Sequence, residues 1–291
     1  MFYKSFCTQF NIMIRQIGFQ SCFIIVLLFG LTNSAYWLLI NYKNPKESLI
    51  DVSEAFILND HSPILDKFFL LSLLLLLLPY CFFNIKNRIN KIDLLQIIRI
   101  NTFSYYTAGS LVSFLGTLIA FFIPLLIELV INQFFFSNTG IMANGFTFYD
   151  LNGGGGLMGT TIISSSVINP GFTLIPISLY ISHPLLYNTI YAFIFSCFMG
   201  IISYMMYTIS LYVQKNIYLF FPLYIFYFLL LKVGDVIYIY VHPLFHFNFF
   251  QYFRITYNMN LSPHYICLLI LFMLLFSSVL LHHKIYIDQG I

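Results

Sequence analysis

Charged side chains are scarce in this sequence. Its 291 residues include 13 Lys or Arg and 10 Asp or Glu, only 8% of the chain, whereas a soluble domain carries about 25%. Hydrophobic residues make up 60%, and Phe and Tyr alone number 35 and 22. A water-soluble fold needs more polar cover than this. The composition therefore excludes a soluble enzyme, a nucleic-acid-binding module and a disordered tail, and it predicts an integral membrane protein.

The sequence also lacks the usual signatures of disulfide, metal and nucleotide sites. Its five cysteines lie within or beside apolar runs and form no C-x-x-C pair, so neither a disulfide framework nor a zinc site is expected. His242 and His246 are four residues apart, but Pro243 disfavours a helix there and no third ligand accompanies them. The glycine-rich run at 154–161 resembles a phosphate-binding loop, yet Thr160 replaces the lysine that contacts phosphate. We therefore expect no catalytic residue, metal or cofactor in this chain.

Long apolar runs are what the sequence has instead. A helix needs about 20 apolar residues to cross a bilayer. Six runs approach or exceed this length, at 21–40, 64–83, 105–131, 185–213, 217–231 (or as far as 241) and 265–281. The runs are continuous rather than alternating, which favours helices over a β-barrel. The sequence predicts an all-α, polytopic membrane protein whose single transmembrane domain, residues 1–291, has six transmembrane helices.

The distribution of basic residues predicts the orientation. If the N-terminus is inside, eight Lys and Arg fall on the cytoplasmic side and five on the outer side. Four of the eight are Lys86, Arg88, Lys91 and Arg99, in the short segment between the second and third runs, where the positive-inside rule is most reliable. Both termini are therefore predicted to be cytoplasmic. The first apolar run is too long for a cleavable signal.

Two segments outside the apolar runs have amphipathic helical patterns. Within residues 1–19 the apolar side chains recur at three- and four-residue spacing, which predicts a helix lying in the membrane interface against lipid headgroups; the alternative is a flanking segment without fixed structure. The apolar positions are Phe2, Phe6, Phe10, Met13 and Ile17. The connection at 84–101 predicts a short cytoplasmic helix that lies on lipid or docks into a groove of a cytosolic protein. Its apolar positions include Ile92, Leu94, Leu95 and Ile98, and its charges include Lys91, Asp93 and Arg99.

Ionisable residues within apolar runs are rare and informative. Glu128 follows Pro124 by four residues, and Lys232 and Asp235 interrupt the fifth run within one helical turn. They are expected either on a translocation path or its outer gate, or at the membrane boundary with Lys232 reaching the headgroups.

The stretch at 232–263 is apolar but contains helix-breaking residues. It includes Gly234, Pro243 and Arg254 among many aromatic side chains such as Phe249. It is expected to form a re-entrant hairpin that lines a cavity, or else an aromatic belt at the interface. The connection at 132–184 is predicted to be a long outer loop.

The order of these parts resembles the membrane subunits of type-two ABC exporters, the bacterial permeases for peptides, drugs and lipids. An interfacial helix precedes six spans, a basic amphipathic connection separates the second from the third, and a broken apolar hairpin precedes the last. Residues 183–230 look especially like the fourth and fifth spans of such permeases. The resemblance covers nearly the whole chain and rests on no invariant signature.

The resemblance implies specific roles for several segments. Residues 91–98, with Arg88 before them, match the coupling helix that docks on a cytosolic ABC ATPase subunit, and residues 234–252 match the re-entrant segment above the pathway. Many relatives have an acidic-x-Gly-Thr run near the coupling helix, whereas here Leu94 follows Asp93 directly, which leaves the contact residues open. ATP and Mg would be bound by the partner ATPase, and a second permease copy or homologue would complete the exporter.

The expected function is therefore that of a permease subunit of an ATP-driven exporter in the bacterial cell membrane. Its nearly uncharged interior suits an amphipathic or hydrophobic substrate such as an antimicrobial peptide, a drug or a lipid. The bacterial origin follows from scarce alanine beside abundant Phe, Tyr, Ile and Asn, typical of an AT-rich genome. Two alternatives stay open: a membrane-embedded lipid-modifying enzyme, for which His183 and His242 are the residues to mutate, and a non-catalytic immunity or sensor subunit.

Overall fold

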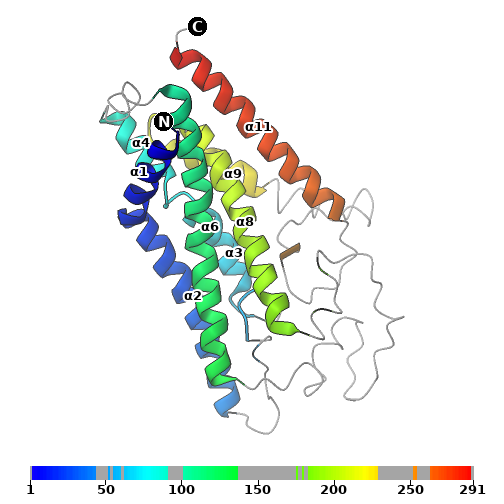
Figure 1. Ribbon diagram of the computed structural model, residues 1–291. Coiled ribbons are helices and arrows are strands. Elements are labelled where there is room, and N and C mark those ends of the chain that lie inside the picture. Colours follow the sequence, from blue (N-terminus) through cyan, green and yellow to red (C-terminus); the bar gives the residue numbers. More distant parts are fainter. Residues whose placement is uncertain are drawn as a thin grey trace.

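The computed structural model is mainly helical in the part of the chain that it describes, which comprises residues 2–43, 52, 55–59, 62–90, 101–136, 175, 179, 183–228, 252–253 and 263–289. No strand occurs among the elements of these residues (Figure 1). The helices are α1 (Phe2–Arg15), α2 (Ile17–Lys43), α3 (Leu65–Leu75), α4 (Cys81–Ile89), α6 (Thr102–Phe135), α8 (Pro184–Ser210), the short 3-10 helix η3 (Asn216–Leu219), α9 (Phe220–Phe228) and α11 (Pro263–Gln289).

Within the described part of the chain, four helices are long and apolar enough to cross a membrane. They are Ile17–Ile40 within α2, all of α6, all of α8, and Ile266–Gln289 within α11. These four coincide with the first, third, fourth and sixth apolar runs of the sequence. The architecture is therefore that of a helical membrane protein, as predicted.

The second apolar run is not one continuous helix. It divides into α3 and α4, separated by a turn at 76–80. Pro79 explains the break, because proline has no N–H to donate within a helix and its ring clashes with the preceding turn. The surrounding backbone shifts to other pairings: the Leu78 N–H donates to the Leu75 carbonyl at 3.0 Å and the Phe82 N–H to the Leu77 carbonyl at 3.3 Å. The fifth run begins as η3 and α9, and its continuation beyond 228 lies outside the described residues.

The long helices run in two opposite directions. In Figure 1, α2 and α6 descend from the end where the N-terminus lies, while α8 and α11 rise toward it. The pair α3 and α4 runs from the far end of the bundle toward the end where the N-terminus lies. Ile57, which precedes α3, bonds to Glu128 near the end of α6, and Arg88 in α4 bonds to the end of α8. We call these the Glu128 end and the Arg88 end of the bundle.

Aromatic rings pack together in the middle of the core. Phe68 of α3, Phe121 of α6 and Phe195 of α8 are fully buried and pack with ring centroids 5.7–6.0 Å apart. Phe253, from the predicted hairpin, is also fully buried and lies 5.0 Å from the ring of Phe198 and 5.5 Å from that of Phe195. Phe253 therefore packs against the middle of α8. The other predicted features of the hairpin lie outside the described residues.

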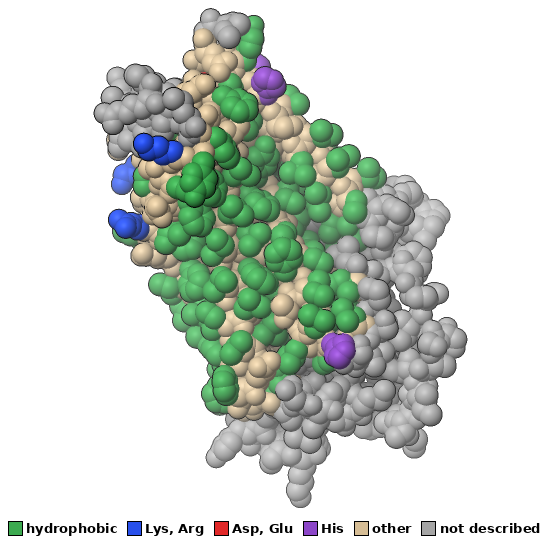
Figure 2. All heavy atoms as spheres, viewed as in Figure 1, with side chains coloured by type: hydrophobic (Ala, Val, Ile, Leu, Met, Phe, Trp, Pro, Cys, Tyr) green, Lys and Arg blue, Asp and Glu red, His purple; other side chains and the backbone are tan. Residues whose placement is uncertain are grey.

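Much of the surface is apolar. Figure 2 shows hydrophobic side chains spread over the face formed by α6, α8 and α11, with basic side chains gathered beside α1 and α4. On α11, large side chains such as Phe272, Leu275 and Val279 are exposed. In water such a surface would drive aggregation, whereas it is the expected boundary with lipid.

Candidate functional site

A cluster of buried polar groups joins α2 and α6 to the segment that precedes α3. We call it the Glu128 cluster. Its side chains have exposed fractions of 0–6%, so water does not compete for their hydrogen bonds. The members are Asn33 and Ser34 of α2, Glu128 and Asn132 of α6, Ser62, and the backbone groups of Ala55 and Ile57.

Neutral donors hold the carboxyl of Glu128. Its Oε1 accepts a hydrogen bond from the backbone N–H of Ile57 at 2.9 Å and another from the Asn33 amide Nδ2 at 3.2 Å. Its Oε2 has no hydrogen-bond partner in the described part of the chain. The acid is therefore buried, anchored at one oxygen and free at the other.

The remaining contacts fix residues 55–59 and Ser62 against the two helices. The Ala55 carbonyl accepts from the Asn33 Nδ2 at 2.7 Å and from the Asn132 Nδ2 at 3.2 Å. Ser62 donates to the Asn33 Oδ1 at 2.8 Å. Since residues 55–59 are all fully buried, this connection packs inside the bundle, where its backbone polar groups need such partners.

Local sequence explains how the helices approach closely here. Glu128 and Asn132 are four residues apart and so share one face of α6, where Ser34 donates to the Asn132 Oδ1 at 2.6 Å. Gly30 of α2 lies directly opposite Glu128: a Cβ at this glycine would come within 2.9 Å of the Glu128 Oε2. A larger residue would therefore push the carboxyl away from its donors.

A second set of polar groups lies at the break between α3 and α4. The Ser203 hydroxyl of α8 donates to the Leu76 carbonyl at 3.2 Å and accepts from the Thr117 hydroxyl of α6 at 2.8 Å. Ser113 lies 2.9 Å from the same hydroxyl. These hydroxyls give the unwound backbone a partner that the helix no longer supplies, which is how broken helices persist inside membranes.

Helix α1 packs along α6 through a polar stripe. Its buried residues are Ser5, Gln9 and Met13. Gln9 donates to the Tyr105 carbonyl at 3.1 Å and accepts from the Tyr80 hydroxyl at 2.5 Å. Of the predicted apolar face, Met13 is fully buried, Phe6 and Phe10 are partly buried and stack 5.7 Å apart, and Phe2 and Ile17 are exposed. The helix is thus observed, while its location in a membrane interface stays a prediction.

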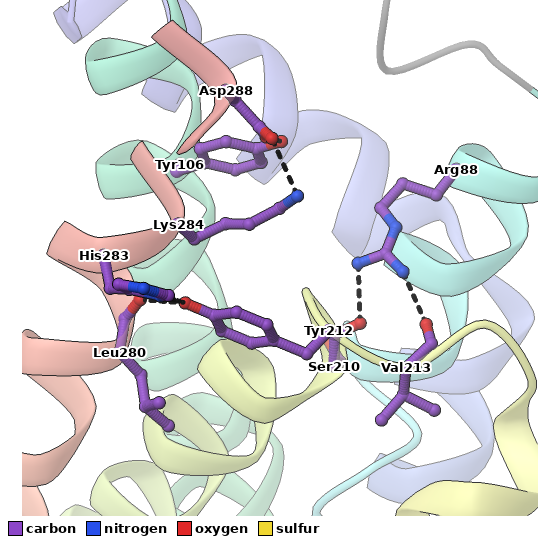
Figure 3. A network of polar contacts seen from close by, with 9 residues as sticks. All are labelled: Arg88, Tyr106, Ser210, Tyr212, Val213, Leu280, His283, Lys284 and Asp288. Atoms are coloured by element: carbon purple, nitrogen blue, oxygen red, sulfur yellow. Dashed lines mark hydrogen bonds and ion pairs between the residues drawn. The ribbon is translucent and has the colours of Figure 1, made fainter. Parts of the chain in front are cut away.

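Arg88 ties α4 to the end of α8. Its guanidinium donates to the Ser210 carbonyl at 2.8 Å and to the Val213 carbonyl at 2.5 Å (Figure 3). The Asn84 amide, one turn earlier, donates to the Ser210 hydroxyl at 3.1 Å. Carbonyls at a helix C-terminus lack partners within the helix and carry partial negative charge, so a cation is well placed there.

The C-terminal helix joins the same end of the bundle. Tyr106 of α6 donates to the Asp288 carboxylate at 2.5 Å, and Lys284 pairs with that carboxylate at 2.8 Å. Tyr212 donates to the Leu280 carbonyl at 2.8 Å and lies 3.0 Å from the His283 Nδ1 (Figure 3). These contacts link the start of α6 and the end of α8 to α11.

The structure reaches only some of the predicted site residues. Of the ATPase-coupling set it describes Arg88, and of the translocation set it describes Glu128, which lies deep in the bundle rather than at its surface. The others lie outside the described residues, namely Lys91, Ile92, Asp93, Leu94, Leu95, Ile98, Lys232, Asp235, Phe249 and Arg254. Their roles stay predictions.

The most connected polar groups were not singled out from the sequence. Asn33, Asn132, Gln9 and Ser203 each bond to a distant part of the chain. A signal existed, because an amide or hydroxyl inside an apolar run must find a partner within the bundle. The partner itself is not visible in sequence.

Metal and disulfide chemistry find no support among the described residues. No group of three or more His, Cys, Asp or Glu side chains converges there, and all five cysteines are free. The buried clusters around Glu128 and Ser203 are built from amides, hydroxyls, backbone groups and one carboxyl.

Comparison with known proteins adds no family to this description. No protein-family model, curated protein or solved structure matches the chain. The class of protein rests on the fold itself: a helical membrane protein with buried polar clusters between its helices.

Proposed function

We propose that this chain is the permease subunit of an ATP-driven exporter of the ABC type, which moves an amphipathic or hydrophobic substrate with a separate cytosolic ATPase. The observation that carries the proposal is the anchoring around residues 91–100. Before them, Arg88 fastens α4 to the carbonyls that end α8. After them, the Asn101 side chain accepts from the Phe103 N–H at 3.3 Å and caps α6.

This anchoring supports a mechanical role for the connection. A force on residues 91–100 would reach α4 and α6 directly and α8 through Arg88. Closure of two ATPases would then move helices as rigid bodies, the usual form of such transitions. The coupling residues proposed for ATPase contact are the predicted ones, from Lys91 to Ile98.

Six spans with both termini in the cytoplasm form part of the proposal. In chain order, α2, the α3–α4 pair, α6 and α8 alternate in direction. Because α11 runs the same way as α8 (Figure 1), the proposed span that begins at α9 would run in the opposite direction between them. Near the Arg88 end lie Lys4, Lys86, Arg88, Lys215 and Lys284, with Asp288 the one acid whose side chain is described there. This imbalance favours the cytoplasmic side.

The interior and the surface suit the proposed substrate and partners. Apart from Glu128, the described core is aromatic, aliphatic or neutral polar, which would favour an amphipathic or hydrophobic cargo over a highly charged one. The re-entrant role of 232–263 gains support from the packing of Phe253 on α8. The exposed apolar faces would contact lipid or a second permease copy.

ATP hydrolysis that co-purifies with the tagged full-length chain tests the proposal. We expect activity with the wild type and with Leu94→Ala, and at least a tenfold loss with Leu94→Pro, because proline costs about 3 kcal/mol inside a helix. Comparison of the two variants separates the effect of breaking the helix from the effect of shortening the side chain at position 94. Absence of ATPase activity from the wild-type preparation would overturn the proposal.

The same preparation distinguishes the two alternatives. Lipid turnover without ATPase, abolished by substitution of His183 or His242, would indicate a membrane-embedded enzyme. A preparation with neither activity would indicate an immunity or sensor subunit.

A further inference from the structure

Glu128 is an acid in a place where an ionised carboxylate is most costly. Its side chain is 0% exposed, and it lies in α6, an apolar helix of 34 residues that is long enough to cross a membrane. Transfer of an ionised carboxylate into such an environment costs at least several kcal/mol unless a cation accompanies it. Groups in this position usually become neutral instead.

No cation among the described residues compensates the carboxyl. Both of its donors, the Asn33 amide and the Ile57 N–H, are neutral and bond to the same oxygen, Oε1. Glu54, Asp60 and His61 lie outside the described residues. The described titratable side chains on the elements around it make no bond to Glu128; they include Cys22 and Tyr36 of α2, Asp66 and Lys67 of α3, and Tyr187 and Tyr191 of α8.

The surrounding oxygen atoms favour a proton over a metal cation. The Ala55 carbonyl already accepts two amide N–H groups, and the Oδ1 atoms of Asn33 and Asn132 each accept a serine hydroxyl. A hard cation such as Ca²⁺ needs about six oxygen ligands. Close packing of Gly30 against Oε2 leaves little room for one, whereas a proton needs almost none.

We propose that Glu128 is a proton-binding site, and that its bound proton holds residues 55–59 in place between α2 and α6. A proton from solvent adds to Oε2 and forms a neutral carboxylic acid, while Oε1 keeps its two donors. Release of the proton leaves a carboxylate that is stable only where water reaches it. Deprotonation therefore favours a state in which this end of the bundle opens to water.

The inference does not require the ATPase partner. It concerns the isolated chain, so its test uses the full-length protein alone in lipid nanodiscs. If no ATPase co-purified, the proposal that Glu128 binds a proton would still stand. If Glu128 bound no proton, the proposal of an ATPase partner would still stand.

Infrared spectroscopy tests for the proton directly. The chain has only three glutamates, Glu47, Glu54 and Glu128, so carbon-13 labelling of glutamate identifies the signal. We expect a protonated-carboxyl band at neutral pH that shifts with the label and disappears as the pH is raised. Because this measurement uses only the wild-type protein, its outcome does not depend on whether a variant folds. Absence of a label-sensitive band at neutral pH would overturn the proposal.

Variants assign the band to one residue. We expect it to vanish in Glu128→Gln and to persist in the double variant Glu47→Gln, Glu54→Gln, which serves as the matched control. A band that persists in Glu128→Gln, or that vanishes in the double variant, would contradict the assignment.

Hydrogen exchange tests the effect on the segment. After correction for the intrinsic rate, amide protection across 55–59 should fall as the infrared band disappears in the wild type. In Glu128→Gln, which stays neutral, protection should not change with pH. Equal pH dependence in both proteins, or none in either, would show that the proton does not hold the segment.

Discussion

The two ends of the bundle handle polar groups in opposite ways. At the Glu128 end a fully buried acid is held by neutral amides and has no cation among the described residues. At the Arg88 end, the side chains of Arg88, Lys284 and Asp288 are partly exposed: Arg88 bonds to carbonyls, and Lys284 and Asp288 bond to each other. The first arrangement is typical of an apolar interior and the second of a membrane boundary.

The difference shows where each end obtains its stability. Hydrogen bonds in the Glu128 cluster have no competition from water, so loss of one partner leaves the other unsatisfied at a high cost. Contacts near the Arg88 end are replaced by water when they break, so each is worth less. The first end is therefore expected to be sensitive to single substitutions, and the second to tolerate them.

The largest expected effect is that of Glu128→Leu. It removes the acceptor of two buried donors, each of which costs about 1–3 kcal/mol when left unsatisfied, so we expect about 2–4 kcal/mol of destabilisation. Glu128→Gln keeps an acceptor and should cost much less. Thermal unfolding in detergent, followed by circular dichroism, measures both. The single tryptophan, Trp37, packs near Ala55 at this end and reports its local loosening by fluorescence. Equal stability of the two variants would contradict the described hydrogen bonds.

Arg88→Gln should come next. Hydrogen bonds from a charged group contribute about 1.5–3 kcal/mol when buried, and partial exposure reduces the expected loss to about 1–2 kcal/mol. Arg88→Lys should lie between, because an ammonium does not reproduce the planar fork that reaches two carbonyls. The same unfolding measurement checks the order. If Arg88→Gln cost more than Glu128→Leu, the proposed contrast between the ends would be wrong.

Ser203→Ala tests the middle of the bundle, between the two ends. It deprives the Leu76 carbonyl of its donor, and such side-chain hydrogen bonds in membranes are worth about 0.6–1.7 kcal/mol. Ser278→Ala is the control, because that exposed hydroxyl bonds only within its own helix, to the Leu275 carbonyl. We expect a measurable loss for the first variant and almost none for the second. Identical unfolding curves would show that the broken helix does not need Ser203.

The smallest effect is expected for Asp288→Asn. Exposed ion pairs contribute about 0–1 kcal/mol, and Tyr106 can still donate to the asparagine oxygen. Any loss should shrink as the salt concentration rises, because salt screens exposed charges. Unfolding at low and high salt measures this. A large loss that salt does not change would place Asp288 in a buried network instead.

Four spans were predictable because the signal is local. The apolar runs that became α2, α6, α8 and α11 are long and uninterrupted, and length with hydrophobicity is all that a membrane helix requires. The break in the second run was less apparent, although Pro79 is visible in the sequence. Proline inside a leucine-rich run permits either a kink or a full interruption, and Ser203, Ser113 and Thr117 stabilise the latter here.

Within the Glu128 cluster, only Glu128 could be predicted from the sequence, and its hydrogen-bond partners could not. Acidic residues are rare inside apolar runs, so Glu128 could be identified from the sequence. Its partners Asn33 and Ile57 lie 95 and 71 residues away in the chain, and nothing local indicates that pairing. The buried stripe of α1 shows the same limit, because Gln9 lies among polar positions that amphipathic spacing assigns to the outside.

The sequence by itself determined that this is a membrane protein and that its secondary structure is helical. With 23 charges in 291 residues, most of the chain has to be buried in lipid or protein, and backbone hydrogen bonding then requires helices. Only the tertiary structure decided which polar groups meet and which remain in contact with water. Those pairings depend on how α2, α6 and α8 pack side by side, and close packing is a property of surfaces that the order of residues does not display.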